Sequence, residues 1–127
     1  MIKPILRVFD VQASLDFYTR LLGFVGQNGL PGLDGKPIYA EAYLGDAQIV
    51  FSPRPSVRRI GEGSATIELY VEIPDDVDFE QFYAFLCRRG VYVVEEMREE
   101  LWGDRVFTVL DPDCNRVMLA QRIRRAA

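Results

Sequence analysis

Apolar and polar residues follow regular spacings along the whole chain, and the order of these patterns predicts its elements. Residues 4–9 alternate between apolar and polar, which is typical of a half-buried strand. A helix is expected from Ser14, a suitable N-cap, to Gly23, with an apolar face made of Leu15, Tyr18, Leu21 and Leu22. Residues 26–37 are rich in glycine and proline and therefore predict a loop.

A β-hairpin is expected around Gly45-Asp46, because these two residues suit a tight turn between strands at 39–44 and 47–52. A two-residue turn at this place sets the register of the two strands. It pairs Tyr43 with Gln48, Glu41 with Val50 and Tyr39 with Ser52.

The second half of the chain repeats the first. After a crossing segment at 53–63, it predicts a strand at 65–72, a helix at 78–89 ended by Gly90, and strands at 91–95, 105–110 and 116–121, with a turn at 111–115. The pair Phe17-Tyr18 returns 65 positions later as Phe82-Tyr83. Because the order of elements is also kept, we predict a duplicated βαβββ module. Repeat one covers about residues 1–60 and repeat two about 61–127, within a single domain.

Alternation along the strands sorts their residues onto two sheet faces. The apolar face, expected to pack under the helices, holds Leu6, Val8, Ala40, Ala42, Leu44, Ala47, Ile49, Phe51, Ile67, Leu69, Val71, Phe107, Val109, Val117 and Leu119. The other face holds Arg7, Tyr39, Glu41, Tyr43, Gln48, Val50, Ser52, Thr66, Glu68, Tyr70, Thr108 and Met118. Antiparallel sheets often leave such a face to water, but three of the six tyrosines fall on it. We therefore favour a ligand cavity over a plain solvated face.

Composition narrows the function classes. The net charge of −4 argues against nucleic acid, which needs a basic stripe. No apolar run approaches the roughly 20 residues of a membrane span, and the first residues carry no secretory or transit signature, so we expect a cytoplasmic protein. Cys87 and Cys114 fit reduced thiols, with Cys87 packed as a small hydrophobe. The chain has no histidine, which excludes Ser-His-Asp catalysis and histidine-ligated metal sites within one chain.

The two ends of the chain carry a family resemblance. Ile5-Leu6-Arg7-Val8-Phe9-Asp10-Val11 with Leu21-Leu22-Gly23-Phe24 resembles the opening of vicinal oxygen chelate proteins. Trp102-Gly103-Asp104-Arg105 and Asp111-Pro112-Asp113-Cys114-Asn115-Arg116 resemble their closing motif, although Cys114 stands where that family commonly has glycine. The resemblance implies an α+β fold, in which curved mixed sheets enclose a cavity and the helices lie outside. It also implies a homodimer with the cavity at or near the interface.

Enzymes of that family hold a divalent metal through four side chains, usually His and Glu. Motif alignment with the family places these positions at Lys3, Val50, Thr66 and Met118, none of which is a good ligand for such a metal. Glu41 and Glu68 lie nearby, but two carboxylates without imidazole make a poor site. The resemblance is therefore strongest to the bleomycin-resistance branch, which lacks the metal and sequesters a drug. We expect no cofactor.

Ten residues are candidate ligand contacts, and no catalytic residue is assigned. They are Arg7, Tyr39, Glu41, Tyr43, Val50, Thr66, Glu68, Tyr70, Trp102 and Met118. Trp102 lies in a loop, where it is expected to stack on flat or cationic groups, although a lone tryptophan is more often core. Arg7 and Glu68 either pair with each other or anchor the ligand.

Three functions compete. The favoured one is a binding protein that sequesters an aromatic or cationic natural product, such as an antibiotic. The alternatives are a metal-dependent lyase or dioxygenase, which the four non-ligating positions disfavour, and a metal-free enzyme using Glu68, Glu41 or the tyrosines, for which no motif argues.

Overall fold

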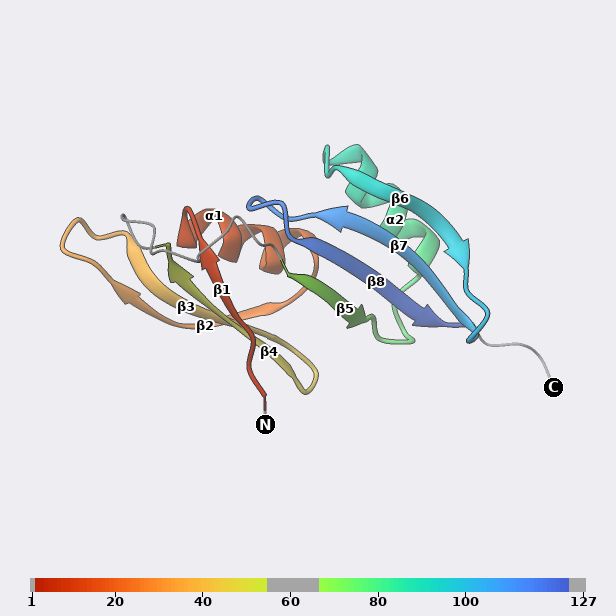
Figure 1. Cartoon of the computed structure of the whole chain (residues 1–127), viewed down its shortest axis with the longest axis horizontal. Helices are drawn as coiled ribbons and strands as arrows, with labels where there is room; N and C mark the ends of the chain where they lie inside the picture. The colour runs from red at the N-terminus through yellow and green to blue at the C-terminus, as the bar shows by residue number, and fades with distance from the viewer. Residues whose placement is uncertain (1, 55–66, 124–127) are drawn as a thin grey trace, which may run out of the picture. The chain divides into compact units, whose positions relative to one another are not determined.

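The computed structural model describes residues 2–54 and 67–123 and divides the chain into two compact units, residues 1–65 and 66–127 (Figure 1). The first unit contains β1 (Ile5–Val8), α1 (Val11–Asp16) with a π-helical continuation (Phe17–Leu21), β2 (Val25–Pro31), β3 (Pro37–Leu44) and β4 (Ala47–Pro53). The second contains β5 (Glu68–Glu72), α2 (Phe79–Arg88), β6 (Val93–Glu99), β7 (Asp104–Leu110) and β8 (Arg116–Arg122). The order is βαβββ twice, which confirms the predicted α+β fold of two modules.

Both sheets have the same topology. The strand orders are β1-β4-β3-β2 and β5-β8-β7-β6. In each sheet the first strand pairs in parallel with the last strand of its module, and the other pairings are antiparallel. The sheets are therefore mixed, as expected. Whether they enclose a cavity within a single domain stays a prediction.

The first helix begins earlier than the sequence pattern predicted. Its N-cap is Asp10, whose carboxylate accepts a hydrogen bond of 3.0 Å from the amide of Ala13, whereas Ser14 is fully buried inside the helix. Asp78 caps α2 in the same way, through the amide of Gln81 at 3.1 Å. The Ser14 prediction was wrong because both residue types cap well, and packing of the helix decided between them.

Strand β2 (Val25–Pro31) replaces the first half of the predicted loop at 26–37. It pairs with β3 from Val25↔Tyr43 to Pro31↔Pro37, with register shifts on either side of Leu30. Its glycines disfavour a strand when taken alone. Pairing with β3 supplies the backbone hydrogen bonds that override this propensity, and the irregular register accommodates the extra residues.

The hairpin and the apolar faces largely follow the prediction. The β3–β4 register runs from Ala40↔Phe51 through Glu41↔Val50 to Leu44↔Ala47. Most of the predicted helix-facing side chains are buried. Ala47 and Ile67 are exposed, because Ala47 is the first residue of β4 and Ile67 directly precedes β5. The crossing segment from 55 onward and the start of the predicted strand at 65–66 lie outside the described residues.

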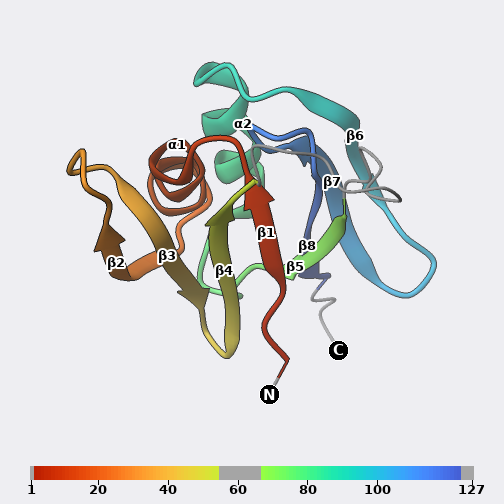
Figure 2. The ribbon, with the colours of Figure 1, turned by 60° about the vertical axis from the view of Figure 1, so that its left-hand side comes forward.

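In each unit the helix lies against one face of its sheet (Figure 2), and aromatic side chains pack between the helix and that face. In the first unit, the ring of Tyr18 lies 5.2 Å from that of Phe51. In the second, the Phe107 ring from β7 packs 5.1 Å from Phe79 and 4.7 Å from Tyr83 of α2. Within the described residues, no helix is both long and apolar enough to cross a membrane.

Cys114 occupies a backbone conformation that suits glycine. Its φ is +64°, in the left-handed region, and it is the only residue other than glycine with a positive φ in the described part of the chain. Both cysteines are free and exposed, so the prediction that Cys87 is packed was wrong. Cys87 lies near the C-terminal end of an amphipathic helix, where its side chain reaches water.

Replacing Cys114 with glycine should therefore raise the free energy of unfolding by about 0.5–1 kcal/mol, because the relief of strain exceeds the added chain entropy. The same change at Cys87, inside α2, should lower it by roughly 0.3 kcal/mol, because glycine is the poorer helix former. Urea unfolding of the two variants measures both changes. Destabilisation by Cys114→Gly would show that the thiol makes a contact of its own.

Candidate ligand-binding face

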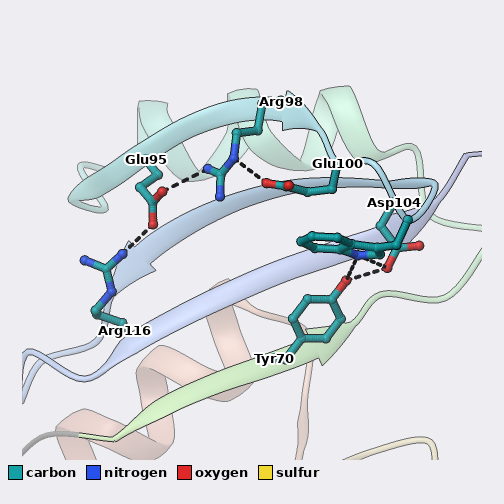
Figure 3. Close-up of polar contacts among 7 residues, drawn as sticks. Tyr70, Glu95, Arg98, Glu100, Asp104 and Arg116 are labelled. Carbon is teal, nitrogen blue, oxygen red and sulfur yellow. Dashed lines mark hydrogen bonds and ion pairs between the residues drawn. The ribbon is translucent and has the colours of Figure 1, made fainter.

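The second sheet carries a polar face on the side away from α2 (Figure 3). Phe107 of β7 packs against α2, so its neighbour Thr108 points to the opposite side. Across the strands, Thr108 lies in one row with Tyr70, Met118 and Glu95. We call the following set the second-sheet polar face: Glu68, Tyr70, Glu72, Glu95, Arg98, Asp104, Thr108, Arg116 and Met118, together with Trp102, which lies against Tyr70 and Asp104.

A cluster of two aromatic rings and a carboxylate lies at one end of this face (Figure 3). The Trp102 indole N–H lies 3.0 Å from the Tyr70 hydroxyl oxygen and 3.2 Å from Asp104 Oδ2. Tyr70 donates its own hydroxyl proton to Asp104 Oδ2. Asp104 is 8% exposed, whereas Trp102 is 53% and Tyr70 46% exposed. The polar edges of both rings are therefore held in place, while much of their surface remains open to solvent.

The turn between β6 and β7 positions Trp102. Gly103 adopts a φ of +92°, and a Cβ at this residue would lie 3.0 Å from Arg122 Nη1. Arg122 in turn donates to the Trp102 carbonyl at 2.9 Å and pairs with Asp104 at 3.4 Å. The positive φ favours glycine here, Arg122 of β8 holds the Trp102 backbone, and Tyr70 of β5 and Asp104 of β7 hold the indole.

The environment of Tyr70 is negatively charged. Partial burial, the hydrogen bond to Asp104 and the charges of Asp104 and Glu72 together hold the pKa of Tyr70 above its usual value, although the Trp102 N–H acts in the opposite direction. The phenol therefore keeps its proton near neutral pH and donates it in the hydrogen bond to Asp104.

A chain of ion pairs crosses the rest of the face. Arg116 contacts Glu95 and lies 3.7 Å from Glu68. The Arg98 guanidinium lies 3.1 Å from the Glu95 carboxylate and 2.5 Å from the Glu100 carboxylate, so it links the two. Three carboxylates share two guanidinium groups, so this network carries a net negative charge. That charge favours a cationic ligand on this face.

Thr108 is fully buried, and among the described residues its hydroxyl is the only buried side-chain group without a hydrogen-bond partner. Such a group costs roughly 1–3 kcal/mol relative to a satisfied one. Thr108→Val keeps the shape and removes the hydroxyl, so it should raise the free energy of unfolding by about 1 kcal/mol. Destabilisation in urea would show instead that an ordered water or a ligand satisfies the hydroxyl.

The polar face of the first sheet is held together by its own contacts. Glu41 accepts hydrogen bonds of 2.5 Å from both the Tyr39 hydroxyl and the Gln48 side chain, and its carboxylate raises the pKa of Tyr39. Arg7 donates to Ser52 at 3.3 Å. Val50 is buried at 8% exposure, and Tyr43 lies beside Gln48 in the register. Both Glu41 oxygens are therefore engaged.

The structure groups the predicted contact residues within each unit. Tyr70 and Trp102 meet directly, whereas Glu68 pairs with Arg116 and Arg7 bonds to Ser52, each inside its own unit. Thr66 lies outside the described residues. Sequence reasoning missed Asp104, Arg98 and Arg116, although Asp104 belongs to the Trp102-Gly103-Asp104 motif and its place beside the only tryptophan was a usable signal.

A hollow of about 230 Å³ lies elsewhere in the second unit, at the ends of β7 and β8. Its lining is polar and charged, and includes Asp75, Arg105, Gln121, Arg122 and Ile123. None of the predicted contact residues lines it. The predicted cavity therefore stays a prediction.

The residues at the family's metal positions do not fit a divalent metal. Lys3 is an exposed cation, Val50 has no donor atom and Met118 offers only a soft thioether. The nearby carboxylates of Glu41 and Glu68 are engaged by Gln48 and Arg116. Among residues 2–54 and 67–123, no group of three acidic or cysteine side chains is placed to hold a metal.

Two tandem βαβββ modules, each with a polar sheet face opposite its helix, define the class of protein. The chain belongs to the Glyoxalase/Bleomycin resistance protein/Dioxygenase superfamily, whose family model matches residues 2–119. This confirms the resemblance stated on the sequence.

The chain is similar to other known proteins in sequence and, for the solved structures, in fold. Uncharacterized proteins of Mycobacterium bovis and Mycobacterium tuberculosis are 27% identical over 97% of this chain and 84% and 75% of their own lengths. The crystal structure of TioX from Micromonospora sp. ML1 has a TM-score of 0.79 at 17% identity, covering 96% of this chain and 98% of its own. TnmS3, an antibiotic binding protein from Streptomyces sp. CB03234, has a TM-score of 0.73 at 24% identity, covering 95% and 93%.

Proposed function

We propose that this protein is a metal-free small-molecule-binding protein that sequesters an aromatic or cationic natural product. The observation that carries the proposal is the half-exposed Trp102 indole, fixed beside Tyr70 by hydrogen bonds along its polar edge. A rigid aromatic surface gives a ligand a large contact area at small entropy cost. The ligand contacts Trp102 and Tyr70, and Glu68 on the same sheet lies beside its polar parts.

The fold relative TnmS3 supports this function over an enzymatic one, because it is described as an antibiotic binding protein. The donor set at the metal positions supports it as well, since Lys3, Val50 and Met118 cannot replace His and Glu ligands. Antibiotic resistance by sequestration, in the cytoplasm, is the biological role that follows.

We further propose that the protein acts as a two-fold homodimer. Strand β2 is an edge strand, and the exposed apolar side chains of Val25 and Leu30 lie on it. Ile38 of the neighbouring β3 is also exposed. Burying such side chains against a second copy is favourable. Light scattering at micromolar concentration should report a dimer, and a monomer would contradict this part of the proposal.

Titration of the Trp102 fluorescence tests the function. Trp102 is the only tryptophan, so its emission reports on this face alone. Bleomycin-type, mitomycin-type and other flat or cationic compounds should be added in turn, and at least one class should change the emission saturably. If no class does so, the second-sheet polar face is not a binding surface for such molecules.

A further inference from the structure

Asp104 touches both exposed rings of the second-sheet polar face, yet it is itself almost completely buried. Its Oδ2 accepts the hydroxyl proton of Tyr70 and lies 3.2 Å from the indole nitrogen of Trp102. A ligand on the face therefore meets the rings and not the carboxylate.

Hydrogen bonding to a carboxylate changes what an aromatic ring binds. When an indole N–H or a phenol O–H donates to an anion, electron density moves into the ring and its face becomes more negative. Cations are attracted to ring faces by this negative charge, and tryptophan is the best platform for them. Both Trp102 and Tyr70 have such a donor directed at Asp104.

Resting on the proposed function, we propose that Asp104 is a specificity-determining residue that polarises Trp102 and Tyr70, so that the face selects flat cationic aromatic ligands over neutral ones of the same shape.

The surrounding charges agree with this selectivity. Glu72 acts on Tyr70 with the same sign as Asp104, and both charges raise the pKa of the phenol. Arg122 pairs with the other carboxylate oxygen, Oδ1, at 3.4 Å, and its side chain is 66% exposed, so solvent screens its charge more than that of Asp104. Arg122 thus reduces the selectivity without reversing it.

A matched pair of probes isolates charge from shape. N-methylquinolinium is a permanent planar cation, and quinoline at pH 8 is its neutral counterpart. Binding to the full-length protein should be measured by Trp102 emission and checked by calorimetry. We expect N-methylquinolinium to bind at least about fivefold more tightly than quinoline, because a partly desolvated cation is attracted to the face of an aromatic ring.

Three variants test which residue sets that ratio. Asp104→Asn keeps an acceptor oxygen and removes the charge, so the preference should fall to about twofold or less, mainly through weaker binding of the cation. Arg122→Gln removes the positive charge that pairs with Asp104, so it should raise the preference for the cation. A merely structural role of Asp104 would not produce that rise. Glu72→Gln, which removes an exposed charge, should lower the preference by a smaller factor. It keeps the proposal testable if Asp104→Asn does not fold.

A control separates the local effect from the overall charge. Glu96 is exposed and acts on Tyr83 of α2, away from the polar face. Glu96→Gln removes the same charge as Asp104→Asn but should leave the ratio unchanged.

Equal binding of both probes to the unmodified protein would overturn the inference, while leaving the face as a binding surface for flat molecules. An unchanged ratio in a folded Asp104→Asn variant would also overturn it. Failure of N-methylquinolinium to bind would overturn it too, whereas the titrations with the larger compounds decide the proposed function separately.

Discussion

Replacing Trp102 with alanine should leave the protein folded and weaken ligand binding by about 1–3 kcal/mol, the range found when an aromatic anchor is removed from a binding site. The indole is 53% exposed, so its removal leaves no cavity in a core. Tyr70 and Asp104 keep their own hydrogen bond without it. Calorimetry with the compound class that changes the wild-type emission measures the loss.

Tyr92→Ala is the matched control for that experiment. Tyr92 is another exposed aromatic residue of the second unit, at 68% exposure, and it precedes β6 outside the Trp102 cluster. Its replacement should leave affinity unchanged. Unfolding of the Trp102→Ala variant would instead mean that the tryptophan is a core residue and that the binding interpretation is wrong.

Replacing Phe107 with alanine should lower the free energy of unfolding by about 3–5 kcal/mol, the largest stability effect we expect. The ring is fully buried and contacts Phe79, Phe82 and Tyr83 of α2. Truncation removes these contacts and leaves a void between helix and sheet. Urea unfolding measures the change, with Tyr92→Ala again as the exposed control. A loss below about 1 kcal/mol would contradict this description of the core.

The fold could be predicted because its signals are local and repeated. Alternation along the strands placed Phe51 and Phe107 on the helix side, and Gly45-Asp46 set the hairpin register. Strand β2 was missed since its glycines give no strand signal until β3 is beside it. The first helix start was misplaced because Asp10 and Ser14 are equally good caps on sequence alone.

The site was only partly predictable, for a different reason. The candidate Tyr70 and Trp102 are 32 positions apart, and alternation placed Tyr70 on the correct face. The contact between them depends on how the turn at Gly103 directs the indole across the strands. The ion pairs of Arg98 and Arg116 depend on strand register in the same way, and sequence spacing does not reveal it.

Native mass spectrometry of the freshly purified protein, with and without a compound that changes the Trp102 emission, tests the central claim most directly. We expect the mass of two chains with no metal, and a further species carrying the compound. Elemental analysis should agree, and a chelator should leave the melting temperature unchanged. The opposite result would be about one nickel, zinc, iron or manganese ion per chain, which the chelator removes while lowering the melting temperature. That result would contradict the account of a metal-free binding protein.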